Sequence, residues 1–246
     1  IVTLLAIQPA YRKFLAHSGS IEIKRELFED LDRNRRIISG AKTPQFDEDI
    51  IFEDVCFSYG IDNEFAVSGL NLSIPAKKKI AFVGASGSGK TTVANLVAHL
   101  IKPTSGRITI GGDIYDEIDI EKFSSKIAYV TQEPVIFNDS IVNNITLWGG
   151  GGMNLKNILE QTKLSGVVSR LNNSHDSSLT TGGGNLSGGE RQRLSFAREL
   201  HRDFKLLILD EATSSLDAEL EKDINKLLAG VYGEVTMVVI AHRLST

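Results

Sequence analysis

The segment from residue 79 to residue 101, KIAFVGASGSGKTTVANLVAHLI, constrains the fold more than any other part of the sequence. A short strand-like run comes first, a glycine-rich loop follows, and apolar residues then recur at helical intervals. The loop fits the pattern G-x-x-x-x-G-K-[ST], and a strand before it and a helix after it are the context that this pattern requires. Chance produces the pattern in roughly one chain in a hundred of this length. The sequence therefore predicts a strand–loop–helix unit that holds phosphate groups.

The chemistry of this loop favours a nucleotide with Mg²⁺. Glycines let backbone N–H groups point inward around phosphates, and the helix N-terminus adds partial positive charge. Lys90 is expected to reach the β and γ phosphates, and the Thr91 hydroxyl to hold Mg²⁺. The net charge is -4, so no general positive field attracts anions and nucleic acid is not expected as a partner. We expect ATP to contact the whole loop, which consists of Gly84, Ala85, Ser86, Gly87, Ser88, Gly89, Lys90, Thr91 and Thr92.

Strand-like and helix-like segments alternate along most of the chain, which predicts an α/β fold. Strand character is found at residues 50–60, 71–84, 106–112, 126–132, 205–210 and 235–241, and helical character at residues 91–101 and 153–171. The strands at 205–210 and 235–241 are nearly continuous apolar runs. Such runs are typical of parallel strands that are buried on both faces between helices.

Two acidic residues end one of these buried strands, in the segment LLILDE. Asp210 is expected to support the Mg²⁺ shell, as the corresponding residue does in phosphate-loop NTPases. Glu211 then falls beside the γ phosphate, where its carboxylate can accept a proton from an attacking water. A structural alternative is that both acids favour the N-terminus of the next helix, where SSLD resembles a capping box. The phosphate loop upstream favours the catalytic interpretation.

The N-terminal part of the chain differs from the rest. Residues 1–33 place apolar side chains at roughly helical intervals, and their apolar start is far shorter than the ~20 residues that span a bilayer. That start is either an ordinary buried segment or the cut end of a longer apolar helix. Residues 34–49 are polar and contain Gly40 and Pro44, which predicts a linker. The single cysteine, Cys56, permits no disulfide within the chain and favours a reducing compartment.

Five further short motifs lie around the phosphate-site motifs in a fixed order. They are FSYG with Tyr59, VTQEP with Gln132, LSGGE at residues 186–190, SSLD with Asp217 and AHRLS with His242. In this order the chain from residue 50 to 246 resembles the nucleotide-binding domain of ABC transporters. The resemblance implies a phosphate-loop NTPase core of the RecA-like type with a mainly parallel sheet, an antiparallel β subdomain and an α-helical signature subdomain.

The resemblance also implies roles for the residues of these motifs. Glu211, His242 and Lys90 are expected to be catalytic, with His242 contacting the γ phosphate. Tyr59 is expected to stack on the adenine, and Gln132 to contact Mg²⁺ with Thr91 and Asp210. Ser187, Gly188, Gly189 and Glu190 are expected to contact the ATP that is held by a second copy of the domain. Physically, glycines that open a helix suit an anion site.

Several of these roles have a structural alternative. The alternative for Gln132, which follows a strand, is a solvated side chain in a loop. The alternative for His242 is a histidine after a buried strand whose hydrogen bonds are made within the fold. Tyr59 shares one strand face with Val55 and Phe57, so all three side chains are alternatively part of the core.

The segments at 129–145 and 240–246 resemble the exporter branch of the family. That branch implies a transmembrane domain on the same polypeptide, an N-terminal segment that ends its last membrane helix, and a location at the cytoplasmic face of a membrane. An acidic residue usually precedes the signature in this branch, whereas Thr181 stands about there in this chain. The alternative function is a non-transport ABC ATPase, such as a DNA-repair clamp or a translation factor. The spacing of about a hundred residues between phosphate loop and signature leaves no room for the long coiled coil of the clamps.

Overall fold

The computed structural model describes residues 40–59, 65–149, 155–172, 178–211 and 233–241, together with Lys222, Lys226, Leu228 and Gly230. The chain divides into two compact units, Ile1–Ser39 and Gly40–Thr246. The predicted N-terminal helix, Asp217 and His242 lie outside the described residues. Among the helices that the structure describes, none combines the length and the apolar character that crossing a membrane requires.

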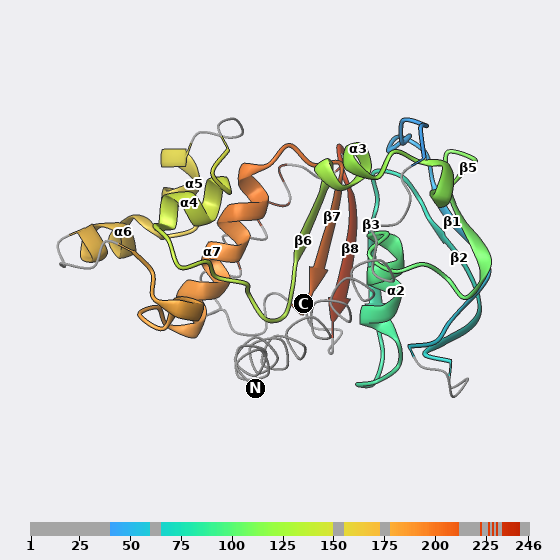
Figure 1. Cartoon of the computed structure of the whole chain (residues 1–246), viewed down its shortest axis with the longest axis horizontal. Helices are drawn as coiled ribbons and strands as arrows, with labels where there is room; N and C mark the ends of the chain where they lie inside the picture. Colours follow the sequence, from blue (N-terminus) through green and yellow to red (C-terminus); the bar gives the residue numbers. More distant parts are fainter. Residues whose placement is uncertain are drawn as a thin grey trace, which may run out of the picture. The chain divides into compact units, whose positions relative to one another are not determined.

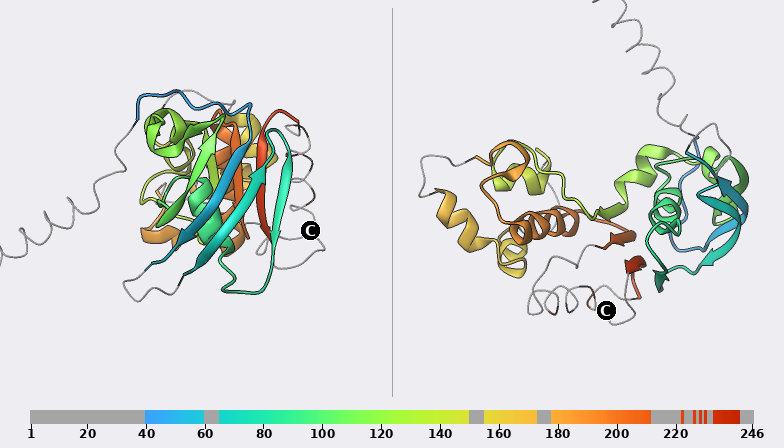
Figure 2. Two further views of the ribbon diagram at one scale, coloured as in Figure 1. Left: turned by 90° about the vertical axis from the view of Figure 1, so that its right-hand side faces the viewer. Right: turned by 90° about the horizontal axis from the view of Figure 1, so that it is seen from below.

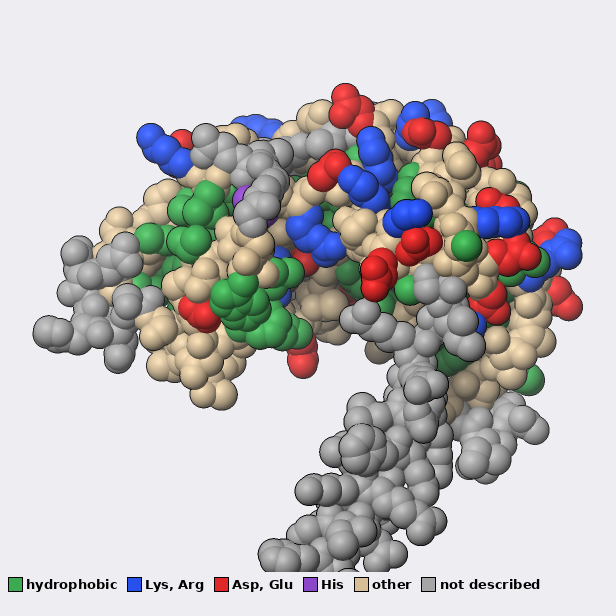
Figure 3. Space-filling view, turned by 45° about the horizontal axis from the view of Figure 1, so that its top comes forward, with side chains coloured by type: hydrophobic (Ala, Val, Ile, Leu, Met, Phe, Trp, Pro, Cys, Tyr) green, Lys and Arg blue, Asp and Glu red, His purple; other side chains and the backbone are tan. Residues whose placement is uncertain are grey.

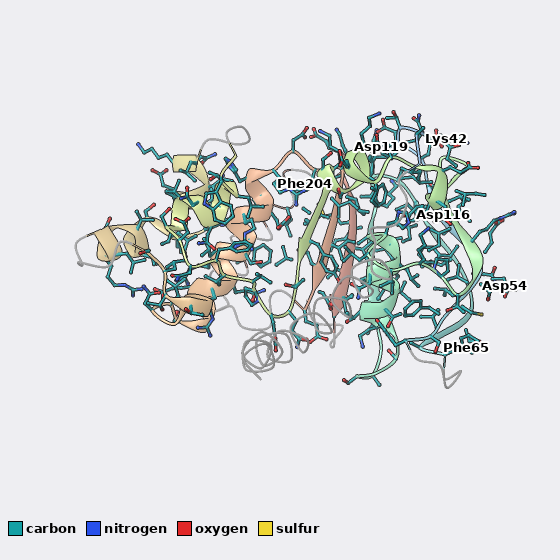
Figure 4. All side chains as sticks on the ribbon, in the orientation of Figure 1. Lys42, Asp54, Phe65, Asp116, Asp119 and Phe204 are labelled. Carbon is teal, nitrogen blue, oxygen red and sulfur yellow. The ribbon has the colours of Figure 1, made fainter. Side chains whose placement is uncertain are left out.

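A four-stranded antiparallel sheet with the strand order β2-β1-β4-β5 forms one part of the second unit (Figure 1). Its strands are β1 (Ile50–Phe57), β2 (Val67–Ile74), β4 (Ser105–Ile110) and β5 (Asp113–Ile114). Strand β1 is irregular after Phe52, where its pairing with β2 shifts and Asp54 adopts a φ of 50°. The bulge changes which side chains face inward, because Phe52 is buried before it and Val55 and Phe57 after it. Asp54, labelled in Figure 4, lies on an inner strand of this sheet, because β1 is placed between β2 and β4.

A second four-stranded sheet is parallel in all its pairings, with the order β3-β8-β7-β6. It contains β3 (Lys79–Val83), β6 (Ile127–Val130), β7 (Leu206–Asp210) and β8 (Thr236–Ala241). Every residue of β7 is buried, as expected for a central strand with covered faces. The predicted single segment at 71–84 supplies one strand to each sheet, because the turn after Ile74 redirects the chain.

The described residues also form several helices. They are α2 (Lys90–Val97), α3 (Ile120–Ser125), α4 (Ile141–Thr146), α5 (Leu155–Gln161), α6 (Ser165–Asn172) and α7 (Gly188–His201), with the 3-10 turns η1 (Tyr115–Glu117) and η2 (Thr181–Gly183). The predicted helix over 153–171 is two helices, because Lys163 adopts a φ of 54° and ends α5. Helix α7 contacts β6, α4 and α5, whereas α2 contacts β7 and β8. In Figure 1 these two helices lie on opposite sides of the parallel strands.

The buried apolar side chains form two clusters that share the parallel sheet. One cluster joins α4 to α7 with Ala128, Val130, Leu207, Leu209 and Met237. The other joins the antiparallel sheet and α2 with Ile127, Leu206, Ile208, Val238 and Ile240. Successive residues of β6, β7 and β8 therefore point into different cores, which is the period-two alternation of a strand. Figure 2 shows the helical elements and the antiparallel sheet on either side of these strands.

The described residues before β1 pack on the antiparallel part of the unit. Lys42 forms ion pairs with Asp113 at 2.6 Å and with Glu117 at 2.8 Å (Lys42 is labelled in Figure 4). The ring of Phe46 stacks on Phe123 with centroids 5.3 Å apart. Residues 40–49, which the sequence assigns to the linker, thus belong to the same compact unit as the sheets.

Candidate functional site

The glycine-rich loop joins the end of β3 to the first turn of α2. Gly87 and Gly89 have φ values of 78° and 84°, a left-handed conformation that glycine adopts without strain. At Gly89 a Cβ atom would lie 2.6 Å from the carbonyl oxygen of Ala66, so the loop also needs a residue without a side chain there. No acidic residue lies in the first turn of α2. The positive end of the helix dipole is therefore open to an anion.

Lys90 folds over this loop. Its Nζ donates hydrogen bonds to the carbonyl oxygens of Gly84 at 3.0 Å and Ala85 at 2.7 Å. These bonds hold a positive charge at the centre of the loop, next to the N-terminus of α2. Phosphate oxygens can take over as acceptors because a charged donor binds an ionised acceptor more strongly than a neutral carbonyl.

Asp210 is the last residue of β7. In the sheet, one strand, β8, separates β7 from β3, the strand that leads into the phosphate loop. Its side chain is buried, and among the described residues its Oδ1 has no hydrogen-bond partner. Burial raises the pKa of Asp210, while a hydrogen bond with Thr91 and the charge of Lys90 act in the opposite direction. A carboxylate oxygen without a partner beside a threonine hydroxyl is a donor set that suits Mg²⁺. Asp210 and Thr91 thus fit the metal that the sequence predicts.

Glu211 is the first residue after the end of β7. Its backbone has a φ of 49°, and its N–H donates to the carbonyl of Ile240 at 3.2 Å. Left-handed backbone at a non-glycine residue costs energy and persists where neighbouring contacts fix it. The Gln132 side chain donates from Nε2 to Glu211 Oε2 at 3.0 Å. The structure therefore brings two predicted site residues into direct contact, 79 positions apart in sequence.

The side chain of Tyr59 lies outside the core. It is 66% exposed, whereas Val55 and Phe57 are buried, so the three side chains are not equivalent. Its ring meets Phe57 edge to face with centroids 4.7 Å apart, and its hydroxyl shares a hydrogen bond of 3.2 Å with Thr92 of α2. An exposed ring next to the phosphate-loop helix can stack on a planar base.

The signature residues form the start of α7. Ser187 caps the helix by accepting from the Glu190 N–H at 3.2 Å, and the Ser187 N–H donates to Glu190 Oε2 at 2.7 Å. This is a complete capping box, and it leaves the Ser187 hydroxyl hydrogen available to an external acceptor. Gly188 is exposed, and a Cβ built on it meets no atom closer than 4.0 Å. The helix start therefore presents donors on an open surface.

Glu190 faces inward rather than toward this surface. Its side chain is largely buried, and Arg170 of α6 binds Oε1 at 3.1 Å. Burial acts to raise the pKa of Glu190, but the hydrogen bonds from Ser187 and Arg170 outweigh it and lower the pKa. Both carboxylate oxygens thus have partners within the chain. Arg170 could not be predicted from the sequence as a partner of Glu190, because nothing in the local pattern around it indicates a partner 20 positions later.

The predicted residues fall into two groups. The first group lies around the C-terminal ends of parallel strands and the start of α2. It consists of the phosphate loop, Tyr59, Gln132, Asp210 and Glu211. The signature residues lie at the start of α7, a helix on the other face of the same sheet. Thr181 is exposed in η2, before the signature. His242 lies outside the described residues.

The class of this domain is that of phosphate-loop nucleotide-binding domains. It is defined by a strand, a glycine loop with lysine and threonine, and an aspartate at the end of a nearby parallel strand. The sequence profile described as ABC transporter matches residues 67–214. The chain belongs to the ABC transporter family and carries its ATP-binding, ATPase-type domain. The predicted fold class is confirmed.

Relatives with known names agree with this family. The chain is 40% identical over 203 residues to the ATP-dependent lipid A-core flippase of Ralstonia nicotianae, covering 80% of this chain and 34% of that protein. The flippase of Desulfotalea psychrophila is 44% identical over 204 residues, covering 82% and 35%. The transport/processing ATP-binding protein ComA of Streptococcus pneumoniae is 38% identical over 200 residues, covering 80% and 28%. The chain thus spans about a third of the length of these relatives.

A solved structure is also similar. A bacterial Atm1-family ABC exporter with ATP bound matches with a TM-score of 0.81 and 31% identity, covering 93% of this chain and 41% of that one. The likeness extends over nearly the whole chain and supports the same fold.

Proposed function

We propose that this domain hydrolyses ATP at sites shared between two copies, and that the cycle drives export through a membrane domain on the same polypeptide. The observation that carries the proposal is the separation of its two anion-binding elements. The phosphate loop opens α2, and the signature opens α7, on opposite faces of one sheet. A second copy that faces the first can bring a signature to each phosphate loop, which gives a two-fold arrangement with two composite sites.

The metal-binding part of the proposal rests on Thr91, Asp210 and Gln132. Mg²⁺ bound there would neutralise charge on the phosphate oxygens, and Lys90 would add its charge from the loop. The unpartnered Oδ1 of Asp210 supports this assignment, because a buried acceptor without a partner is costly unless a ligand occupies it.

Glu211 is the proposed general base for the attacking water. The hydrogen bond from Gln132 orients its carboxylate next to the metal ligands, and the left-handed backbone directs Glu211 away from the strand. His242 is proposed to contact the γ phosphate. Tyr59 is proposed to stack on the adenine, which its exposure and its contact with α2 support.

Several exposed apolar side chains support a partner at the helical elements. Five of these side chains are between 37% and 59% exposed: Val135, Phe137, Val142, Leu147 and Trp148. The rings of Phe137 and Trp148 are 5.4 Å apart, and the Trp148 Nε1 donates to Asp139 Oδ2 at 2.8 Å. Figure 3 shows hydrophobic side chains gathered over the helical part of the unit. Such clusters mark contact surfaces, and we assign this one to the membrane domain at the cytoplasmic face of the membrane.

The names of the relatives, a flippase and a transport/processing protein, favour export over a DNA-repair or translation role. The test uses the 246-residue chain with and without ATP and Mg²⁺. We expect ATP turnover that rises with the square of protein concentration at low concentration, because only the dimer completes a site. We also expect a dimer in sedimentation when Glu211→Gln is saturated with ATP. Turnover strictly proportional to protein, with a monomer throughout, would contradict shared sites.

A further inference from the structure

Helix α7 faces the outer edge of strand β6. In the part of the chain that the structure describes, β6 pairs only with β7 and is therefore an edge strand of the parallel sheet. The carbonyl of Lys126 accepts from the Leu206 N–H at the start of β7. Successive residues of a strand direct their backbone groups to opposite sides, so the N–H and C=O groups of Tyr129 and of Thr131 point away from β7. These groups need partners from another element.

Two side chains of α7 supply these partners. Glu199 Oε2 accepts from the Tyr129 N–H at 3.3 Å, and Gln192 Nε2 donates to the Thr131 carbonyl at 3.4 Å. Gln192 and Glu199 are about two turns apart and therefore share one face of the helix. Gln192 is only 2% exposed, so its amide bonds to groups within the chain rather than to solvent.

The bond from Gln192 lies next to the segment that contacts the proposed general base. Thr131 comes directly after the end of β6 and directly before Gln132. The Gln132 amide donates to Glu211 Oε2 at 3.0 Å. Because the strand has ended, pairing with β7 no longer holds the backbone at Thr131. A donor on the Thr131 carbonyl therefore sets the direction in which the chain leaves the strand, and with it the place of the Gln132 amide.

We propose that Gln192 is a positioning residue for ATP hydrolysis: it holds the Thr131 carbonyl so that the Gln132 amide orients the Glu211 carboxylate. The inference rests on the proposed function, because it requires Glu211 to be the general base. Gln192 belongs to the helix that begins with the signature. The same helix then serves both composite sites, since its first residues contact the partner's ATP and Gln192 supports the base of its own chain.

The test measures ATP turnover by the 246-residue chain at a protein concentration that saturates dimerisation. Gln192→Met removes the amide and keeps a long, adaptable side chain in the same space. We expect kcat to fall by about 10-fold, less than the ~10²-fold that a misplacement of about 1 Å can cost. The KM for ATP and the ATP-dependent dimer in sedimentation should stay unchanged, because neither the phosphate loop nor the signature is altered.

A double-mutant cycle shows whether Gln192 acts through Gln132. Gln132→Ala removes the amide that bonds Glu211, so Gln192 has nothing left to position. Gln192→Met should then cause no further loss of kcat in the Gln132→Ala chain, whereas independent effects would multiply. Single-turnover measurements keep the slow variants measurable.

Glu199→Met is the matched control on the same helix and strand. It removes the other bond between α7 and β6 and also leaves a methionine in place. It should lower the melting temperature and leave kcat near the wild-type value. The reason is that Tyr129 lies within β6, opposite Ile208 of β7, where strand pairing holds the backbone.

Each outcome supports or contradicts the inference. Unchanged kcat in Gln192→Met would overturn it, and so would losses that multiply in the double variant. An equal loss of kcat in Glu199→Met would overturn it as well, because α7 would then act on β6 as a whole. Gln192→Leu is measured alongside, and if neither variant folds, the bond serves the fold and the inference is wrong. Wild-type turnover in Glu211→Gln would instead contradict the proposed function.

Discussion

A carboxylate placed at the start of α7 should block the shared site without damaging the domain that carries it. Gly188 is the first residue of α7, after the capping Ser187, and a Cβ there meets no atom closer than 4.0 Å. An acidic residue in the first helical turn interacts favourably with the helix dipole. Gly188→Asp should therefore fold normally and melt close to the wild-type temperature.

The size of the effect follows from charge alone. A carboxylate roughly 5 Å from a phosphate charge is repelled by about 3 kcal/mol when the effective dielectric constant is near 20. A two-fold dimer contains two such contacts, so the total is about 6 kcal/mol. This corresponds to about 10⁴-fold weaker ATP-dependent dimerisation. ATP binding to the monomer should be unchanged, because the phosphate loop lies on the other face of the sheet.

The decisive assay mixes Gly188→Asp with Lys90→Ala and measures ATP turnover. Each variant alone should be inactive, since both of its composite sites contain a fault. A mixed dimer has one site with an intact loop from one chain and an intact signature from the other. Its second site combines both faults, and there the carboxylate faces a loop that holds little ATP. An equal mixture should recover about a quarter of the wild-type sites, because about half of its dimers are mixed and each has one intact site.

A mixture that forms mixed dimers but is as inactive as its components would refute the shared-site model. In that case each chain uses its own signature. Weaker ATP binding by the Gly188→Asp monomer would lead to the same conclusion.

Three further outcomes are expected. Glu211→Gln should retain ATP binding and slow turnover by on the order of 10² or more, the scale of a lost general base, and unchanged turnover in dimers would exclude that role. Tyr59→Ala should cost about 1 kcal/mol of ATP affinity and Tyr59→Phe much less, as calorimetry can measure; equal losses would show that the hydroxyl matters more than the ring. Burial lowers the pKa of His99 to about 4, whereas the value in the unfolded chain is near 6.5. Neutral His99 therefore contributes its full stability above pH 6.5. That stability is lost as pH falls toward 4, because the unfolded chain binds a proton there before the folded chain does. Urea unfolding should show about 2 kcal/mol lost between pH 8 and pH 5 on account of this residue, and His99→Phe should lose correspondingly less; equal losses would contradict the assignment.

The sequence predicted the parallel sheet and the phosphate loop because both depend on local patterns. Continuous apolar runs identify β7 and β8, and the glycine pattern identifies the loop between β3 and α2. The end of α2 was harder to predict, because the pattern suggests a helix to residue 101 whereas α2 ends at Val97. His99 adopts a φ of 55° there, which is not helical, and its buried ring packs on Tyr115.

Long-range contacts explain what the sequence did not predict. The division of 153–171 into two helices occurs at Lys163, where no glycine or proline marks a break. The Gln132–Glu211 bond and the Arg170–Glu190 ion pair join residues on different elements. The pattern around each residue is compatible with a solvated side chain, and only the three-dimensional arrangement supplies its partner.

The sharing of the parallel sheet between two cores has a consequence for how the domain opens. Strand β7 is buried throughout and paired on both sides, and its alternate residues complete both clusters. Loss of the helical cluster alone uncovers Leu207 and Leu209, and loss of the other cluster uncovers Leu206 and Ile208. Neither event frees the backbone amides of β7, which remain bonded to β6 and β8. Those amides should therefore exchange hydrogen with solvent only when the whole sheet separates, while amides of α5 and α6 exchange through smaller, local openings.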